Sequence, residues 1–308
     1  MNFTRFFKRR KKAPVNEKQH LFSIGMFTGL SPFELGASSK ITNPVLTRKD
    51  VIDAKCLFVA DPFILKVKSA WYMFFEMYNG YKWKGEIGLA KSDDAYQWVY
   101  QGVVLSEPFH LSYPYVFCWG NEFYMIPESG NNHSIRLYRA KNFPFGWEYV
   151  CTLLSHQKFA DSSVIYHHEK WWLFTETNTD LKHDTLKVFY SVNLLGPWRE
   201  HPLSPVVRGN PHIARPAGRI IAYDEKLIRF AQDCYPIYGT QVLAFEVNIS
   251  EKRYEEKPVA PNPLLKASGE GWNANGMHHL DLHCSTDGEW LACVDGWIAV
   301  DSLVEHND

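Results

Sequence analysis

A two-strand sequence pattern occurs five times in this chain, and such a repeat restricts the fold more than any other feature of the sequence. The clearest copies pair residues 60–64 (ADPFI) with 71–76 (WYMFFE), 112–116 with 123–128, and 160–164 with 171–176. In all three, the residue after the small Ala or Ser lies 15 positions before a Glu that ends an aromatic run. Two looser copies begin at Ala214 and Met277.

A repeat of about 50 residues that holds several short strands is typical of a β-propeller, in which each repeat forms one blade. Five copies therefore predict an all-β, five-bladed β-propeller. Equivalent positions of the innermost strands converge on the central channel, so the leading residue of each copy is expected at one shared funnel. These leading residues are Asp61, Tyr113, Asp161, Arg215 and His278, which are 52, 48, 54 and 63 positions apart.

The ends of the chain are expected to close the ring. The fifth copy, from about residue 276 to 304, has room for three strands, and residues 21–30 (LFSIGMFTGL) have the pattern of a lone strand. We predict that this early strand completes the last blade, because closure removes exposed sheet edges. Residues 1–20 are then a basic tail, and residues 21–308 form a single propeller domain.

Charge and cysteine content exclude several classes of protein. The net charge is −1, but residues 1–12 carry six cations and no acid, so the rest of the chain is at −7. A mildly acidic body argues against a nucleic-acid binder. The six cysteines have no Cys-x-x-Cys spacing and are expected to be reduced and structural. We also predict that the protein has no metal site and no cofactor. Since no signal peptide or membrane-spanning run is visible, we predict a cytoplasmic protein.

The tail combines Phe3, Phe6 and Phe7 with its cations. As a short helix it would contact an anionic membrane surface, where each cation contributes about 1 kcal/mol. This predicts a protein peripheral to the inner face of the membrane. The alternative is a solvated tail without a partner.

Two family resemblances follow from these motifs. Ala60-Asp61-Pro62 and the strand pairs that end in an acid resemble the five-bladed glycoside hydrolases that include arabinanases, β-xylosidases and invertases. Over residues 24–297 the chain is more specifically similar to the propeller domain of plant glucosamine inositolphosphorylceramide transferases and its free-standing bacterial relatives. That likeness is carried by residues 107–115 (EPFHLSYPY), 214–219 (ARPAGR) and 276–279 (GMHH).

The hydrolase resemblance implies three carboxylates at the funnel. Asp61 matches the family's base or nucleophile, and Asp161 matches its helper aspartate. The position of the general acid falls on Arg215, which cannot donate a proton at neutral pH. Hydrolysis of an ordinary glycosidic bond requires such an acid opposite the base.

Three functions remain open. In the first, an inverting hydrolase uses a displaced acid, and the candidates are Glu128, Glu176, His278 and His279. In the second, a glycosyltransferase uses Asp61 as base while Arg215, Arg219 and His278 grip a phosphate leaving group. In the third, the propeller binds a glycan without catalysis and serves a separate transferase. Arg215 could equally pair with Asp61 or Asp161 and hold the ring together.

Further residues are candidates for substrate contact: His279 beside His278, Tyr113 at a leading position, His110 at the rim, and Trp272 in a Gly-rich loop. Taken together, the sequence favours a carbohydrate-active enzyme, with glycosyl transfer in the synthesis of a surface glycan or glycolipid as its reaction. The expected substrate is a carbohydrate or a sugar phosphate.

Overall fold

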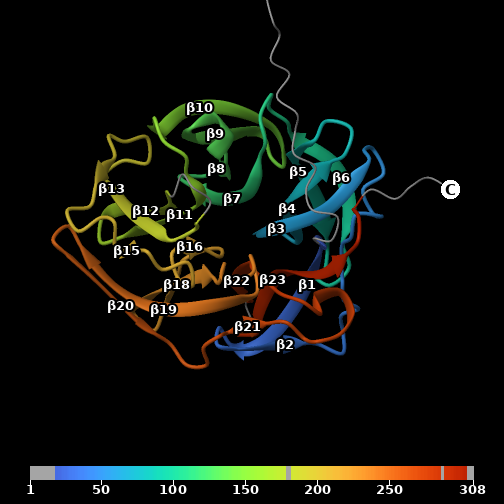
Figure 1. Ribbon diagram of the computed structural model, residues 1–308. Helices are drawn as coiled ribbons and strands as arrows, with labels where there is room; N and C mark the ends of the chain where they lie inside the picture. Colours follow the sequence, from blue (N-terminus) through green and yellow to red (C-terminus); the bar gives the residue numbers. More distant parts are fainter. Residues whose placement is uncertain (1–17, 178–181, 286–287, 304–308) are drawn as a thin grey trace, which may run out of the picture.

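The five sequence repeats form five antiparallel sheets arranged as a ring around a central channel (Figure 1). The structure is a computed structural model that describes residues 18–177, 182–285 and 288–303. Within these residues the only helical segments are two short 3₁₀ turns, η1 (Gly130–Asn132) and η2 (Gly271–Asn273). The predicted five-bladed β-propeller is therefore confirmed. None of the described helical segments is long and apolar enough to cross a membrane.

Blades 1 to 4 follow the chain in order, each with its innermost strand first. Blade 1 contains β3 (Cys56–Val67), β4 (Ala70–Asn79), β5 (Lys84–Ser92) and β6 (Val99–Leu105). Blade 2 contains β7 (Ser112–Trp119), β8 (Glu122–Glu128), β9 (Ser134–Asn142) and β10 (Phe145–Ser155). Blade 3 contains β11 (Ala160–His167), β12 (Lys170–Glu176), β13 (Thr185–Ser191), β14 (Arg199–Glu200) and β15 (Val207–Arg208). Blade 4 contains β16 (Arg215–Pro216), β17 (Ile221–Tyr223), β18 (Lys226–Gln232), β19 (Gln241–Ser250), β20 (Arg253–Pro258) and β21 (Leu265–Lys266).

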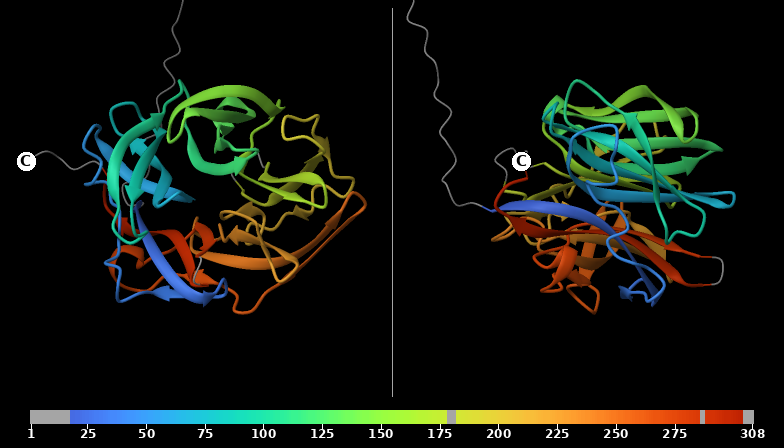
Figure 2. Two further views of the ribbon diagram at one scale, coloured as in Figure 1. Left: turned by 180° about the vertical axis from the view of Figure 1, so that it is seen from behind. Right: turned by 90° about the vertical axis from the view of Figure 1, so that its right-hand side faces the viewer.

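Blade 5 joins the two ends of the chain, as expected (Figure 2). It contains β22 (Leu280–Cys284), β23 (Trp290–Val300), β1 (Gln19–Ser31) and β2 (Glu34–Ala37). β1 pairs with β23 over eleven positions, from Gln19 opposite Val300 to Gly29 opposite Trp290. The ends contribute two strands each, instead of the expected three and one, because the chain turns at Pro32 and Phe33 and returns as β2.

The innermost strands of the first three blades share a β-bulge at the leading residue. In blade 1, Ala60 pairs with Glu76 and Phe63 with Phe74, so one extra residue is accommodated between these pairs. The same shift follows Ser112 and Ala160. The leading residues Asp61, Tyr113 and Asp161 all have left-handed backbone conformations, with φ of 52°, 44° and 49°. Bulges re-aim side chains, and such strained residues cluster at functional sites.

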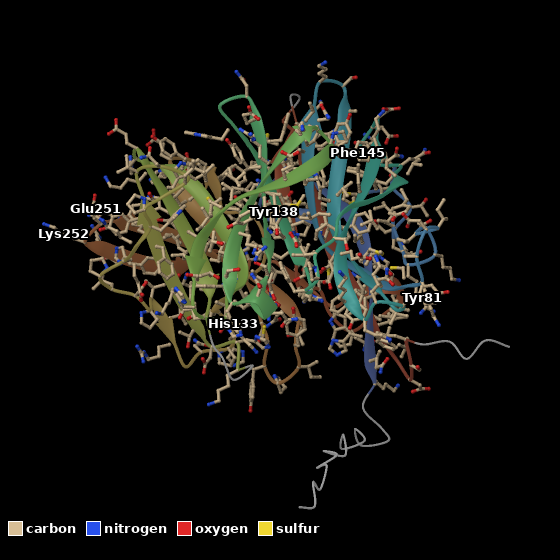
Figure 3. All side chains as sticks on the ribbon, turned by 90° about the horizontal axis from the view of Figure 1, so that it is seen from above. Tyr81, His133, Tyr138, Phe145, Glu251 and Lys252 are labelled. Carbon is tan, nitrogen blue, oxygen red and sulfur yellow. The ribbon has the colours of Figure 1, made fainter. Side chains whose placement is uncertain are left out.

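The end of the propeller at which the innermost strands begin is called the site face here. It carries the β4–β5 loop with Tyr81 and the β8–β9 loop with His133, which lie at the same end of the molecule in Figure 3. The ring is held by apolar side chains packed between neighbouring blades, with the largest cluster spanning blades 1, 2 and 3. This packing fixes the leading residues relative to one another.

Candidate functional site

Leading residues from four blades meet at the site face, as the repeat predicted. The guanidinium of Arg215 donates from Nε to Asp161 Oδ2 at 2.6 Å. His278 Nε2 lies 3.7 Å from Asp61 Oδ1. These residues therefore converge in the structure as predicted. Their side-chain contacts divide them into two adjoining groups.

The first group is centred on Arg215. Besides Asp161, its nitrogens contact His183 Nδ1 at 2.9 Å and Glu128 Oε2 at 3.5 Å. Glu128 Oε2 also accepts the backbone N–H of Asp161 at 3.1 Å, and Gln232 donates to Asp161 Oδ2 at 2.6 Å. Blades 2, 3 and 4 are thus connected through one buried cation.

The second group is a chain of three residues, Asp295, His278 and Asp61. Asp295 Oδ1 bonds His278 Nδ1 at 2.6 Å, and its Oδ2 accepts the backbone N–H of Asp61 at 2.9 Å. His278 Nε2 faces the Asp61 carboxylate. Since Nδ1 donates to Asp295, Nε2 is the atom that can exchange a proton with Asp61.

Two further imidazoles are held in the neutral form beside these groups. His279 Nε2 donates to the carbonyl of Pro62 at 2.9 Å, which leaves Nδ1 as an acceptor 3.8 Å from Asp61 Oδ1. His110 Nδ1 accepts the backbone N–H of Gly85 at 2.8 Å, so its Nε2–H points toward Glu76 Oε1 at 3.4 Å. Burial lowers the pKa of both rings to about 4.

Burial and charge give the carboxyl groups different protonation states. Burial raises the pKa of Asp61 to about 7, an effect that His278 opposes and the Asp161 and Asp295 carboxylates increase. Burial, together with the Asp161 carboxylate, also raises the pKa of Glu128 well above its usual range, although Arg215 opposes the rise. Asp61 is therefore close to half ionised near pH 7, and Glu128 keeps its proton to a higher pH than an exposed glutamate does.

The other two aspartates are ionised. Burial alone would raise the pKa of Asp161, but the Arg215 guanidinium holds it below its ordinary value. For Asp295 the His278 imidazole has the same effect, and Asp295 in turn raises the pKa of His278 against the influence of burial. The site therefore contains two ion pairs beside carboxyl groups of raised pKa.

Aromatic side chains surround this centre. Phe22 stacks on His278 at 4.6 Å between ring centroids, and Tyr238 approaches the same imidazole edge-on at 5.3 Å. Tyr238 also lies under the Arg215 guanidinium, at 5.1 Å. Phe58 stacks on Tyr78 at 5.2 Å. Aromatic faces of this kind are suited to apolar sugar faces and to cations.

Several predicted site residues have other surroundings. The Tyr113 hydroxyl bonds Ser163 and the backbone of Gly218 inside the channel, so its side chain forms the channel interior beneath Asp61. Arg219 pairs with Asp281, which accepts the backbone N–H of Ile64, three residues further along β3 than Asp61. Arg219 therefore belongs to a deeper layer than Arg215.

Trp272 lies outside the two groups. The Trp272 ring packs against the backbone of Gly25 in β1 and Gly296 in β23, where a Cβ on either glycine would approach it within 3 Å. This packing accounts for the tryptophan and both glycines. Glu176 is buried at the end of β12, opposite Ala160.

One set of donors could be considered for a metal. Asp61, His278 and Asp295 each offer a ligand atom, all within 4.8 Å of one another. These atoms already form the short His278–Asp295 hydrogen bond and accept the backbone N–H groups of Tyr113 and Asp61. We therefore assign them to the hydrogen-bonded chain described above and not to a metal centre.

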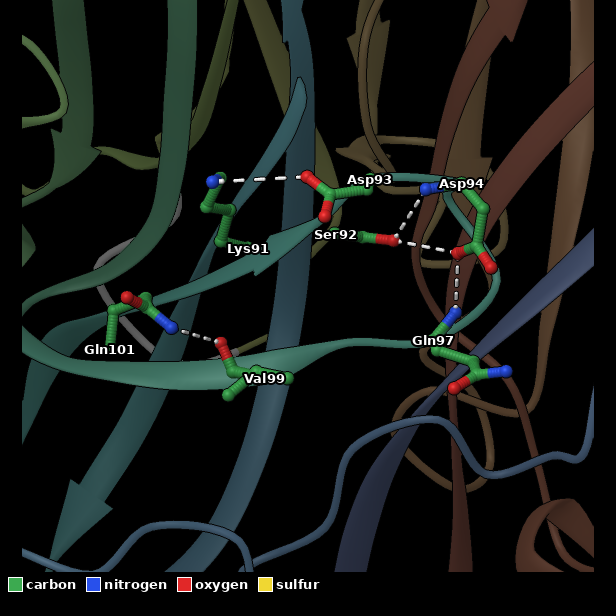
Figure 4. A pocket seen from close by; sticks show the side chains of 7 residues that line it. All are labelled: Lys91, Ser92, Asp93, Asp94, Gln97, Val99 and Gln101. Atoms are coloured by element: carbon green, nitrogen blue, oxygen red, sulfur yellow. Dashed lines mark hydrogen bonds and ion pairs between the residues drawn. The ribbon is translucent and has the colours of Figure 1, made fainter. Parts of the chain in front are cut away.

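A surface hollow of about 440 Å³ lies away from this chemistry, at the outer strands of blade 1 (Figure 4). Asp94 Oδ1 there accepts the backbone N–H groups of Tyr96 and Gln97 and the hydroxyl of Ser92. The hollow thus contains the turn that follows β5, and its polar groups stabilise that turn.

Sequence reasoning missed four residues of the site: Gln232, Asp295, His183 and Tyr238. Asp295 occupies the position at which an acid ends the second strand in every repeat, and a feature shared by all repeats indicates an architectural role. The sequence signal for Asp295 is His278, since the blade 5 repeat alone has a histidine at its leading position together with an acid at the end of its second strand. His183 and Tyr238 lie in loops that differ between blades, so the repeat gives no sign of them.

Comparison with known proteins supports the sequence resemblance. Residues 15–297 match the family model described as glucosamine inositolphosphorylceramide transferase 1, N-terminal. The chain is 36% identical over 298 residues to the transferase of that name from Oryza sativa subsp. japonica and 35% identical to that from Arabidopsis thaliana. Each match covers 89% of this chain but only 40% and 39% of the two relatives. The chain thus spans about two fifths of their length.

Solved structures with the same fold are glycoside hydrolases. A thermostable family-43 glycoside hydrolase superimposes with a TM-score of 0.59 at 16% identity, covering 84% of this chain and 92% of its own. The catalytic domain of a GH62 α-L-arabinofuranosidase from Coprinopsis cinerea gives 0.58 at 12% identity, with coverages of 92% and 98%. At these identities the likeness concerns the fold.

Proposed function

Since the chain belongs to the family of the N-terminal region of glucosamine inositolphosphorylceramide transferase 1, we propose that its site binds the sugar end of a glycan or glycolipid and promotes glycosyl transfer to it. The observation that carries this proposal is Asp61, a buried carboxyl with a pKa of about 7 at the meeting point of the blades. A group of this pKa is suited to act as a general base at neutral pH.

In the proposed reaction the Asp61 carboxylate takes the proton of an acceptor hydroxyl. That oxygen forms a bond to the anomeric carbon of the donor, and the bond from this carbon to the leaving group breaks with its electron pair. His278, anchored by Asp295, stabilises the ionised form of Asp61 from 3.7 Å. Asp161 and Arg215 are positioning residues, because they contact each other and fix blades 3 and 4.

The contacts of Arg215 argue against its predicted grip on a phosphate. Its three guanidinium nitrogens face Asp161, His183 and Glu128, and its side chain is only 12% exposed. A phosphate would have to displace carboxylates from a low-dielectric site. We therefore assign the acceptor sugar, and not the donor phosphate, to this site.

The location of the site fits a lipid-linked acceptor. β1 begins at the site face, where His20 stacks on Trp297 and Phe22 on His278. Residues 1–12, whose cations predicted membrane contact, precede this strand and lie outside the described residues. Exposed Trp83 lies on the β4–β5 loop of the same face. We propose a cytoplasmic protein whose site face is turned toward an anionic membrane.

Because the relatives are more than twice as long, their transferase activity belongs to longer chains. A separate transferase partner is also part of the proposal. In that arrangement the propeller supplies the acceptor site and the partner supplies the donor site.

Inverting hydrolysis is the second candidate, and Glu128 favours it. Its side chain is 18% exposed and its pKa is raised, as a general acid requires. Its Oε2 is engaged with Asp161 and Arg215, which leaves Oε1 for the proton. Glu128 would then replace the acid that the hydrolase pattern puts at position 215.

The experiment compares wild type, Asp61→Asn and the matched control Asp93→Asn, whose carboxylate is 89% exposed on blade 1. Each protein is incubated with p-nitrophenyl glycosides and, separately, with nucleotide sugars plus a glycolipid acceptor, both alone and together with a transferase that supplies the donor site. Transfer by wild type and the control that falls about 10²-fold or more in Asp61→Asn supports the proposal.

The other outcomes overturn it in different ways. Release of p-nitrophenol that depends on Asp61, without transfer to the glycolipid acceptor, establishes hydrolysis. Glycan binding without turnover by wild type, alone or with a transferase whose activity does not need Asp61, establishes a binding module.

A further inference from the structure

We infer that a second carbohydrate site lies between blades 3 and 4, at the end of the propeller opposite the site face, and that it takes a neutral glycan chain of two or more sugars. Two hollows of about 270 and 360 Å³ form it, and together they are called the interblade groove here. Glu251 and Lys252, at one edge of this groove, lie farther from the site face than His133 does (Figure 3). The inference goes beyond the proposed function, because the groove shares no lining residue with the groups around Arg215 and His278.

The two hollows adjoin each other because both are lined by Lys170 and Glu251. The smaller hollow lies between β13, the β13–β14 loop and the β19–β20 turn, and the larger lies between the β11–β12 turn and the same β19–β20 turn. Lys170 Nζ is 2.9 Å from Glu251 Oε1, so this ion pair connects blade 3 to blade 4. A ligand that fills both hollows therefore crosses one fixed ion pair.

Backbone hydrogen bonds hold the walls of the groove in place. His201 Nε2 donates to the carbonyl of Ser250 at 2.8 Å, which ties the β19–β20 turn to blade 3. In the β13–β14 loop, the N–H of Asn193 donates to the Ser191 hydroxyl and the N–H of Gly196 donates to the carbonyl of Asn193. Because these walls are already ordered, a ligand loses little affinity to the ordering of loops.

Several polar groups of the smaller hollow are available to a ligand. The side chains of Tyr190, Asn193 and Arg199 make no hydrogen bond to any part of the chain that the structure describes. The Glu251 carboxylate binds Lys170 through Oε1 and has further lone pairs. Donors and an ionised acceptor thus lie side by side. A sugar hydroxyl suits such a set, because it donates and accepts at once.

The mixture of charges disfavours ionic ligands. One carboxylate lies among three cations, and a second carboxylate adjoins them at the edge: the carboxylates are Glu251 and Glu169, and the cations are Lys170, Arg199 and Lys252. A phosphate group would meet Glu251, and an ammonium group would meet the cations, so each is repelled by part of the groove. Neutral hydroxyls accept hydrogen bonds from the cations and donate to the carboxylate without such a cost.

The size and polarity of the groove also favour sugars over a protein partner. A stable protein interface buries about 800 Å² on each partner around an apolar centre. Here the centre is an ion pair, and the exposed apolar side chains Val192 and Leu195 lie on the β13–β14 loop at one side. Volumes of 270 and 360 Å³ lie at the low end for ligand pockets, about 300–1,000 Å³, as expected for one sugar residue in each.

The test is native electrophoresis of the full chain through gels that contain dextran, xylan, mannan or polygalacturonate, with a plain gel as reference. At least one of the three neutral polysaccharides should retard the wild type. Glu251→Ala and Arg199→Ala should each weaken this binding about tenfold, the loss of one hydrogen bond to a charged group. Both residues are exposed, so neither substitution removes buried packing.

The matched control is Glu255→Ala, which changes the net charge by the same amount as Glu251→Ala. The Glu255 carboxylate is 62% exposed on β20, outside the groove, so this variant should be retarded like the wild type. Competition then measures the length of the ligand. A trisaccharide of the retarding polysaccharide should compete at a concentration about tenfold or more below that of its monosaccharide, because it fills both hollows.

Four results overturn the inference. Equal retardation of Glu251→Ala and the wild type puts the glycan elsewhere on the protein, and equal competition by trisaccharide and monosaccharide excludes a site for a chain. Retardation by polygalacturonate alone, abolished by salt, shows attraction of anions to the cations. The absence of retardation in every gel excludes the site. None of these results bears on the proposed function, which the transfer assay with Asp61→Asn decides separately.

Discussion

Replacing Asp61 by Asn should make the protein more stable at alkaline pH while it removes the proposed base. In the wild type the Asp61 carboxyl is buried, and its pKa is raised from 3.8 to about 7. A carboxyl group whose pKa is raised in the folded state makes the protein more stable at low pH, where the group is protonated, than at high pH, where it is ionised. Its contribution is present below 3.8 and is lost as the pH rises through about 7.

The size of the effect follows from the pKa. A difference of one in pKa corresponds to 1.36 kcal/mol, so ionised Asp61 costs the folded state about 4 kcal/mol above pH 7. At pH 5 only part of this cost is present. Relative to wild type, Asp61→Asn should therefore gain about 2 to 3 kcal/mol between pH 5 and pH 8. The amide oxygen can still accept the N–H of Tyr113, so this hydrogen bond is kept.

The assay is urea unfolding of both proteins at pH 5, 6, 7 and 8, with Asp93→Asn as the control. The exposed Asp93 carboxylate should give the same difference from wild type at each pH. If the stability of Asp61→Asn relative to wild type stays constant or falls between pH 5 and pH 8, the raised pKa of Asp61 is wrong, and with it the argument for a general base.

Three further predictions follow from the contacts of the site. Asp161→Asn should lower the free energy of unfolding by about 3 kcal/mol, because it leaves Arg215 without its closest partner. Adding Arg215→Met to this variant should recover at least about 1 kcal/mol, and additive losses in a double-mutant cycle would contradict the ion pair. Asp295→Asn should lower the pKa of His278, measured by NMR of the imidazole nitrogens, and an unchanged titration would show that Asp295 does not hold its charge. Deletion of residues 1–12 should reduce sedimentation with phosphatidylserine vesicles but not with neutral ones, and equal sedimentation of both proteins would remove the membrane contact.

Much of the fold was determined by the sequence alone. The 15-residue spacing between Asp61 and Glu76 predicted a strand pair, and its recurrence predicted five blades. The lone early strand predicted closure of the ring, which β1 and β23 confirm. These features are periodic, and periodicity reports the backbone position of a residue because blades are equivalent by rotation.

The roles within the site depended on the tertiary structure. Arg215 and Asp161 are 54 positions apart, and Arg215 and Glu128 are 87 apart, so no local pattern records that they share one ion-pair network. Tyr113 and Asp161 hold equivalent positions, yet one fills the channel interior and the other joins the ion pair. The β-bulge sets the backbone position of the leading residue, and the surrounding side chains determine which contacts its own side chain makes.

Sequence alone thus determined that residues 61, 161, 215 and 278 would meet at one end of a ring. Only the tertiary structure decided which of them are charged and which partners they take. The physical reason is that a position follows from the repeat, whereas a protonation state follows from burial and from charges contributed by other blades.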